Sequence, residues 1–403
     1  MKVSAIVAEY NPFHNGHKFH IEETRRKTGC DCVVAVMSGN FVQRGEPALY
    51  NKWLRAEAAV RSGADLVLEL PAAYACAGAE FFAKGAVKII NRLGCVDHIS
   101  FGAEETSLDT LKDIAKLLAF EDKEISSAIK GYMDEGMSYA SARSKALAGS
   151  APEGYAEIIS KPNNILAVEY LKQLILTESS IGPVLIERKA AGYYEEDPDE
   201  KFAGAGKLRD ILRDGEDIKS ISDYIPEECL EIYKEKYMCF SEDMFELVVY
   251  KIISESSEKL SEIDSVVEGL ENRAKKAAAD AIDQESLVDL IKSKRYSRTS
   301  IQRMLVRILL DIKSSDMRAF ETCCSSYARV LAFNDTGAKL IRKIKKQDRP
   351  DIKIITNINR EKIEDKVLKR MLELDILASE IYDLICFSKP GINSDHRMKP
   401  YMK

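Results

Sequence analysis

The chain lacks several features that mark membrane and secreted proteins. No run among its 403 residues approaches the ~20 apolar residues that cross a bilayer. Met1, Lys2 and Val3 lead directly into an apolar segment, without the core of a signal peptide. We therefore expect a cytoplasmic protein with no membrane partner. At this length we also expect two or three domains.

Paired cysteines and excess positive charge are scarce as well. Of nine cysteines, only Cys30 with Cys32 and Cys323 with Cys324 lie close together, and neither pair has a second pair at zinc-ribbon spacing. A net charge of −6 excludes a globally basic nucleic-acid binder. A local cationic patch would still be sufficient for phosphate contacts, because screening limits each contact to a Debye length of ~8 Å.

Histidine is rare too, yet three of the five histidines fall within residues 14–20. The apolar run 3–8 predicts a buried strand, after which the spacing of apolar residues becomes helical. His14, His17 and His20 would then share one helix face near the helix N-terminus, where free N–H groups and the helix dipole favour an anion. The segment therefore predicts a polyphosphate site.

Two other interpretations of this histidine cluster stay open. The cluster could be a packed structural element, or a zinc site, since histidine is a common zinc ligand. No cysteine or carboxylate lies nearby at ligand spacing, so we predict no metal site. Gly16 favours a bound ligand, because a missing side chain lets the ligand approach the backbone closely.

Apolar segments of strand length alternate with helical patterns through the first half of the chain. Strands are expected at residues 3–8, 32–37, 65–70, 97–101 and 183–187. This alternation predicts βαβ units, and therefore an α/β fold with a Rossmann-like, doubly wound parallel sheet. In such sheets, ligands bind at the carboxyl ends of the strands.

Residues that follow these strands are candidate ligand contacts. Gly102 follows the fourth strand, where a base or ribose could approach the backbone or an ordinary turn could form. Arg188 and Lys189 follow the fifth strand, and two cations at that place suit a triphosphate. Asn163 or Asn164 either caps the next helix or contacts the ligand.

The sequence pattern changes near residue 215, beyond which helical spacing dominates to about residue 331. We therefore expect a domain boundary near 215, with the α/β domain that would bind the nucleotide at 1–214 and a mainly helical domain at 215–403. A strand pattern near 351–357 and a helical pattern at 361–387 suggest a small α/β element at 350–403.

A basic run at residues 292–307 contains no acidic residue, although the chain as a whole is acidic. Its cations Lys294, Arg295, Arg298 and Arg303, with Tyr296 between them, are typical of an RNA backbone contact with one stacking platform. The alternative is a solvated helix face. Five further cations gather at 339–346, on an expected helix.

Two runs resemble a known family. His14-Asn15-Gly16-His17 is an HxGH motif of the kind found in the nucleotidyltransferase superfamily. The longer runs, residues 9–17 and 38–47, resemble the bacterial tRNA(Met) cytidine acetate ligase family. The resemblance implies an enzyme that uses ATP, with Mg²⁺, and acetate to form acetyl-adenylate. It further implies N4-acetylation of the wobble cytidine of elongator tRNA(Met), which the helical domain would hold.

The resemblance also implies roles for individual residues. His14, His17 and Arg188 would be catalytic, and Asn163 rather than Asn164 would contact ATP. The full set of implied ATP contacts is Val7, Ala8, Glu9, Tyr10, Asn11, Pro12, Phe13, His14, Asn15, Gly16, His17, Lys18, Phe19, His20, Gly102, Asn163, Arg188 and Lys189.

One segment departs from the superfamily pattern. Gly204 and Gly206 stand where the superfamily usually carries a Ser/Thr-rich signature before a helix. Backbone N–H groups, with Lys207 or Arg209, would then replace hydroxyl contacts to phosphate.

Two other functions stay open at this point. A nucleotidyltransferase acting on a small-molecule acid or phosphate would share the N-terminal half, but it would leave the basic clusters of the second half without a role. A non-catalytic RNA-binding protein would explain those clusters and leave the histidine motif without one. The sequence does not indicate an oligomeric state or how acetate is selected.

Overall fold

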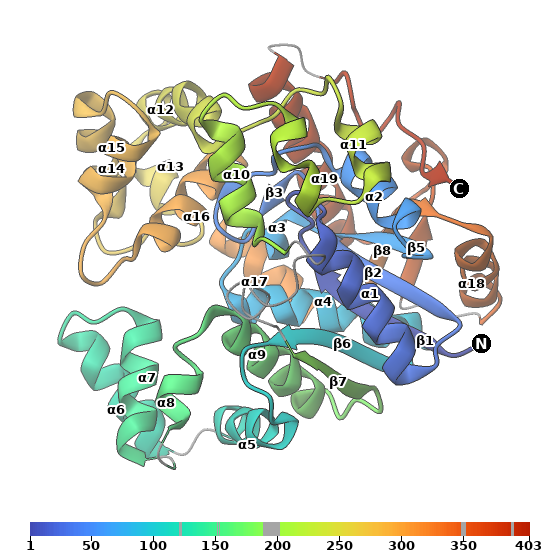
Figure 1. Cartoon of the computed structure of the whole chain (residues 1–403). Helices are drawn as coiled ribbons and strands as arrows, with labels where there is room; N and C mark the ends of the chain where they lie inside the picture. Colours follow the sequence, from blue (N-terminus) through green and yellow to red (C-terminus); the bar gives the residue numbers. More distant parts are fainter. Residues whose placement is uncertain (121–122, 151, 153, 188–201, 348–351, 388–390) are drawn as a thin grey trace.

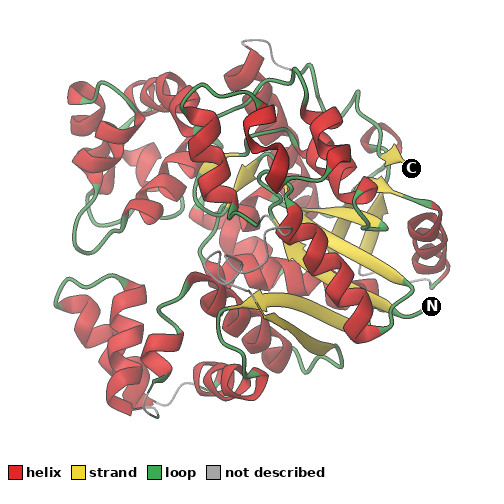
Figure 2. Ribbon diagram, viewed as in Figure 1, coloured by secondary structure: helices red, strands yellow, loops and turns green. Residues whose placement is uncertain are grey.

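A mostly parallel sheet forms the centre of the molecule, with helices on both faces (Figures 1 and 2). The computed structural model of the chain describes residues 1–120, 123–150, 152, 154–187, 202–347, 352–387 and 391–403. The strand order is β10-β8-β5-β2-β1-β6-β7, with β9 paired to β8. The strands are β1 (Val3–Ala8), β2 (Cys32–Ser38), β5 (Leu66–Leu70), β6 (His98–Ala103), β7 (Gly182–Glu187), β8 (Ser326–Phe333), β9 (Ile352–Ile355) and β10 (Tyr401–Met402).

The first five strands of this sheet are parallel and lie within two residues of the predicted bounds. The predicted α/β fold with a doubly wound sheet is confirmed. Alternate residues of β2 enter different cores: Cys32 and Val34 belong to one, Val33 and Ala35 to the other. Both faces are therefore covered, which explains the continuous apolar run in the sequence.

Helices form two layers and two lateral lobes (Figure 1). One face carries α1 (Asn15–Thr28), α2 (Lys52–Arg61), α10 (Ala205–Arg213), η1 (Ile218–Tyr224) and α11 (Glu227–Tyr233). The other carries α3 (Ala72–Ala75), α4 (Ala79–Leu93), α5 (Leu108–Ala119), α9 (Pro162–Leu176), α17 (Ser314–Thr322), α18 (Asp335–Lys346) and α19 (Lys366–Phe387).

The lobes are both helical. One consists of α6 (Lys123–Asp134), α7 (Tyr139–Ser150) and α8 (Tyr155–Ile158). The other consists of η2 (Ser241–Met244), α12 (Phe245–Ser254), α13 (Ser257–Ser261), α14 (Leu270–Asp280), α15 (Gln284–Ile291) and α16 (Arg298–Leu309). A short turn η3 (Ile358–Arg360) precedes α19, and a hairpin of β3 (Phe41–Val42) and β4 (Glu46–Pro47) follows β2. No helix in the described part of the chain is long and apolar enough to cross a membrane.

The sequence prediction of helix up to about residue 331 was wrong for residues 326–331. These residues begin β8, which pairs antiparallel with β5, and every residue from Ser326 to Ala332 is buried. A strand buried on both faces has no alternation that would distinguish it from a buried helix. The segment 215–403 therefore supplies β8, β9 and β10 to the same sheet as β1. The domain boundary at 215 stays a prediction.

A buried ion network connects this C-terminal segment to α2 and β5. Lys52 Nζ lies 2.7 Å from Glu69 Oε1 and 2.9 Å from Asp395 Oδ1. Arg329 Nη2, from β8, lies 2.9 Å from the same Asp395 oxygen. All four side chains are at most 2% exposed. Two cations and two carboxylates neutralise one another, which makes the burial of each charge tolerable.

Asp375 of α19 borders this network and has a different protonation state. Its Oδ1 accepts a hydrogen bond of 2.7 Å from the Ala72 N–H, and its Oδ2 accepts one from the Tyr327 hydroxyl. Burial, reinforced by the charge of Glu69, raises the pKa of Asp375 to about 8. The folded protein therefore holds a proton here that the unfolded chain releases above pH ~4.

This difference predicts that stability falls as pH rises from about 4 to about 8. Within that window the folded state binds more protons, so Asp375 alone lowers the free energy of unfolding by up to about 1.4 kcal/mol per pH unit. Asp375→Asn mimics the protonated acid and should flatten this slope in urea unfolding measured at several pH values. Asp109→Asn, on an exposed part of α5, should keep the wild-type slope. Equal slopes in wild type and Asp375→Asn would contradict the assignment.

Candidate active site

Two histidines close the N-terminus of α1 by reciprocal hydrogen bonds. The Nδ1 atom of His14 accepts a 3.0 Å hydrogen bond from the Gly16 N–H. The Nδ1 atom of His17 accepts one of 3.2 Å from the His14 N–H. The two rings stack with centroids 3.7 Å apart. This capping box satisfies two of the N–H groups that a helix start leaves unpaired.

The same hydrogen bonds fix which ring nitrogen carries the proton. An accepting Nδ1 has no hydrogen, so each neutral ring carries its N–H on Nε2. His14 and His17 therefore both present an Nε2–H donor beside the positive end of the α1 dipole. Such a pair of donors suits an anion, and phosphate oxygens in particular.

Aromatic packing holds this histidine pair in place. The ring of His17 packs edge-on against Tyr10 at 4.9 Å and lies 5.5 Å from Phe13. A Cβ atom on Gly16 would lie 2.9 Å from the His14 ring. Gly16 is thus required by the cap itself, a reason that differs from the ligand approach expected from the sequence.

The third histidine has another position. His20 Nε2 lies 3.0 Å from the hydroxyl of Ser100 in β6, and that hydroxyl also contacts Thr24. The structure thus brings together two of the three predicted imidazoles, while His20 connects α1 to the neighbouring strand. Ser100 is fully buried, and this polar contact gives its hydroxyl a partner.

A buried arginine that the sequence analysis missed shapes the loops around the site. Arg55 of α2 donates to the carbonyl oxygens of Glu9 at 2.5 Å, Ser38 at 3.1 Å and Tyr50 at 2.8 Å, and also to that of Gly39. It joins the carboxyl ends of β1 and β2, where the two family-like runs lie. Burial lowers the pKa of Arg55, although four carbonyl dipoles solvate the charge.

The loop after β2 connects the site to the second helical lobe. Gln43 N donates to Glu9 Oε1 at 2.9 Å, and Arg303 Nη1 of α16 donates to the Gln43 carbonyl at 3.3 Å. Gly45 has a φ of +79°, and a Cβ there would lie 2.3 Å from the backbone nitrogen of Arg303. Burial raises the pKa of Glu9, opposed by the Gln43 hydrogen bond and by Arg209.

The glycine-rich segment before α10 also lies against this loop. Arg209 Nη1 donates to the Asn11 carbonyl at 2.8 Å, and its Nη2 pairs with Glu46 at 3.0 Å. Phe202 packs edge-on against Phe19 of α1, with centroids 5.9 Å apart. Of the two cations expected to replace a hydroxyl signature, Arg209 of α10 thus contacts the loop after β1, whereas Lys207 is exposed.

Residues at the end of β6 form a third side of the site. Helix α9 begins at Pro162 with Lys161 as N-cap, so neither asparagine caps it. Asn164 Oδ1 accepts from the N–H groups of Glu104 and Glu105 at 2.9 Å each, and Asn163 Nδ2 donates to Glu104 Oε1 at 2.5 Å. Asn164 is therefore structural.

The other predicted contacts at strand ends have two outcomes. Gly102 lies next to the last residue of β6, close to the carboxyl end as expected. Arg188 and Lys189 follow β7 directly, but both lie outside the described residues.

The basic run 292–307, which leads into α16, is largely paired within the protein. Arg295 lies 2.6 Å from Glu268, and Arg298 contacts both Glu285 and Asp289. Arg303 is half-buried against the β3–β4 loop, as described above. Among the cations predicted to bind tRNA, Lys294 is exposed and has no ion pair within the described part of the chain.

The Tyr296 side chain, predicted as a stacking platform, is also engaged. Its hydroxyl donates to Glu268 at 2.6 Å, and its ring packs at the edge of the core.

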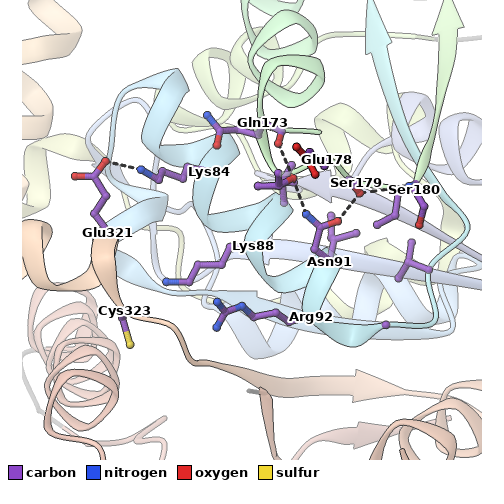
Figure 3. Close-up of a pocket in the computed structure, with 16 residues that line it drawn as sticks. Lys84, Lys88, Asn91, Arg92, Gln173, Glu178, Ser179, Ser180, Glu321 and Cys323 are labelled. Carbon is purple, nitrogen blue, oxygen red and sulfur yellow. Dashed lines mark hydrogen bonds and ion pairs between the residues drawn. The ribbon is translucent and has the colours of Figure 1, made fainter. Parts of the chain in front are cut away.

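A pocket of about 590 Å³ lies away from this site (Figure 3). Lys84, Lys88 and Arg92 of α4 line it, together with residues that precede β6 and β7. It therefore opens at the amino edge of the sheet and contains none of the predicted site residues.

Comparisons with known proteins agree with the fold and the motif. The HIGH Nucleotidyl Transferase family matches residues 1–396 of the chain. The chain is 37% identical to the tRNA(Met) cytidine acetate ligase of Clostridium novyi (strain NT), with all of both chains covered. It is 40% identical to the enzyme of that name from Acetivibrio thermocellus, over 97% of this chain and 96% of the relative. Thermotoga maritima TmcAL, solved with alpha-thio ATP, superposes with a TM-score of 0.89 at 28% identity, covering 100% and 99% of the two chains.

The position of Arg55 predicts that even a lysine cannot replace it. Lysine keeps the charge but lacks the fork that reaches several carbonyls at once, and each orphaned buried carbonyl costs about 1–3 kcal/mol. Arg55→Lys should lower the free energy of unfolding by several kcal/mol and weaken ATP binding, measured by urea unfolding and calorimetric titration. Arg61→Lys, on the half-exposed end of the same helix, serves as the matched control. If both variants behave alike, Arg55 does not organise the site loops.

Proposed function

The chain belongs to the HIGH nucleotidyl transferase family and, within it, to the tRNA(Met) cytidine acetate ligases, and we propose that it is an ATP-dependent ligase that acetylates tRNA(Met). The substrates would be ATP, acetate and the N4 amine of the wobble cytidine. The resemblance noted in residues 9–17 and 38–47 is confirmed by whole-length relatives. The observation that carries the proposal is the stacked pair of Nε2–H donors at the start of α1.

The first step would be adenylation of acetate. An acetate oxygen attacks the α-phosphorus of ATP in line, a P–O bond to that phosphorus forms, and pyrophosphate leaves with the electrons of the broken P–O bond. His14 and His17 donate hydrogen bonds to the phosphate oxygens on which negative charge grows. The protein supplies no nucleophile, because holding the two substrates together provides much of the rate gain.

The second step would transfer the acetyl group. The N4 amine of the cytidine attacks the carbonyl carbon of acetyl-adenylate, the C–O bond to AMP breaks, and the amine loses one proton to solvent. The products are AMP, pyrophosphate and N4-acetylcytidine in the tRNA. The mixed anhydride has to be kept from water until the amine attacks it, which the aromatic surroundings of His17 favour.

Several residue roles are part of the proposal. The strand–loop–helix segment 7–20, Gly102 and Asn163 would contact ATP, and Arg188 with Lys189 would balance the phosphate charge. Within the described residues, no three His, Cys, Asp or Glu side chains gather as metal ligands would. We therefore propose that Mg²⁺ arrives with ATP, held by phosphate oxygens and water.

The proposal also assigns different roles to the two expected domains. Residues 1–214 would carry the chemistry and residues 215–403 would bind tRNA, with Lys294, Arg295, Arg298 and Arg303 as candidate contacts. Because its substrate is tRNA, we propose that the enzyme acts in the cytoplasm.

Isotope exchange between pyrophosphate and ATP tests the first step without tRNA. The wild-type protein should exchange only when acetate is present. His14→Ala and His17→Ala should each lower exchange about 100-fold or more, because each removes a donor to the reacting phosphate. His98→Ala is the control and should exchange normally, because His98 is the first residue of β6 and lies at the amino edge of the sheet, away from the α1 histidines.

Three results would change the assignment. Exchange that needs a different acid or phosphate would favour the nucleotidyltransferase alternative. Tight tRNA binding without any exchange would favour a non-catalytic RNA-binding protein. Normal exchange in both histidine variants would remove the catalytic role of the α1 pair.

A further inference from the structure

Helix α18 carries an unpaired basic surface. Its five cations, Lys339, Arg342, Lys343, Lys345 and Lys346, are all exposed. Within the described part of the chain, none of their side chains makes an ion pair or a hydrogen bond. The only acidic residue on the helix is Asp335, in its first turn. In a chain of net charge −6, this concentration of free positive charge stands apart.

The contrast with the α16 region is direct. In the run 292–307, Lys292, Arg295, Arg298 and Arg307 each pair with a carboxylate from elsewhere in the chain. Pairing of this kind lowers the potential that a phosphate would meet. The run 292–307 is unbroken in the sequence, but its positive potential is therefore weaker than that of the α18 cluster. Among the described residues, the α18 cations have no such carboxylate partners.

The geometry of α18 suits a phosphate chain. At 100° per residue, Lys339, Arg342, Lys343 and Lys346 fall on one stripe about 100° wide and about 10 Å long. That length spans two successive backbone phosphates. The opposite face, with Leu340, Ile341 and Ile344, is buried in the core. Since no apolar face is available for insertion, the helix does not fit a lipid surface, which amphipathic basic helices otherwise bind.

The position of α18 separates it from ATP. A Cβ on Gly337 would touch the Asp65 carbonyl, so the first turn lies at the amino edge of the sheet. His14 lies beyond the opposite edge, about 20 Å away at ~3.3 Å per residue over the six residues of β1. No lysine reaches that far, whereas an RNA stem does. Figure 1 shows α18 at the right margin of the molecule and α16 on the left.

We propose that the basic stripe of α18 binds the phosphate backbone of the tRNA substrate, at a distance from the reacting base. This inference rests on the proposed function, because it takes tRNA as the partner. The contact is sequence-independent, so it adds affinity and orients the RNA without selecting bases.

The experiment compares two triple variants of equal charge change. Lys339→Glu, Arg342→Glu and Lys343→Glu together alter the stripe. Lys112→Glu, Lys116→Glu and Lys130→Glu together alter three lysines of α5 and α6, of which Lys116 and Lys130 are exposed and Lys112 is partly exposed, and serve as the control. Circular dichroism checks that both variants keep their helices. Affinity for full-length tRNA(Met) transcript is then measured between 50 and 200 mM salt, which are ordinary conditions for a plot of affinity against salt.

The α18 variant should bind tRNA at least tenfold more weakly, and the slope of log K against log salt should fall by about 2, close to one unit per lost phosphate contact. The control should bind as wild type does. ATP–pyrophosphate exchange without RNA should be normal in both variants. Equal loss in both variants would reduce the effect to net charge and overturn the proposal, as would unchanged affinity in the α18 variant.

Failure of the proposed function gives a different result. A wild-type protein that shows no acetate-dependent exchange would overturn the ligase reaction, while its tRNA affinity and salt slope would still report on α18.

Discussion

The reciprocal hydrogen bonds between His14 and His17 are the interaction on which the site depends. They begin helix α1, and by occupying both Nδ1 atoms they leave the proton of each neutral ring on Nε2. The hydrogen bonds that cap α1 therefore also determine which ring nitrogen of each histidine carries the proton. Gly16 is part of the same helix cap, because any side chain there would displace the His14 ring.

Helix α2 supplies two buried cations that have different partners. Arg55 binds backbone carbonyls at the ends of β1 and β2, while Lys52 binds Glu69 and Asp395 in the buried network. Asn40 Oδ1 also accepts the Lys52 N–H at 2.7 Å, so the loop after β2 is tied to the same helix turn. The loops around the α1 histidine pair are therefore held in place by two fully buried charges.

The sequence was sufficient for the parallel half of the sheet and for the histidine motif, since both depend on residues within a few positions of each other. It was insufficient where partners are distant. Arg55 resembles an ordinary helix residue until the carbonyls around it are known, and β8 resembles a buried helix until it pairs with β5, about 260 residues earlier. The cations of the run 292–307 appear unpaired in sequence because their carboxylates lie outside the run.

The distance of Asp395 along the chain also affects folding during synthesis. Asp395 neutralises Lys52 from 343 positions further along the chain. During synthesis, Lys52 already has a carboxylate partner in Glu69, 17 positions further along, whereas Arg329 adds a second cation to this core that stays uncompensated until Asp395 has left the ribosome. Closure of the buried ion network therefore has to wait for nearly the whole polypeptide, and chaperones would meet an intermediate in which β8 is made but Arg329 has no carboxylate to balance it.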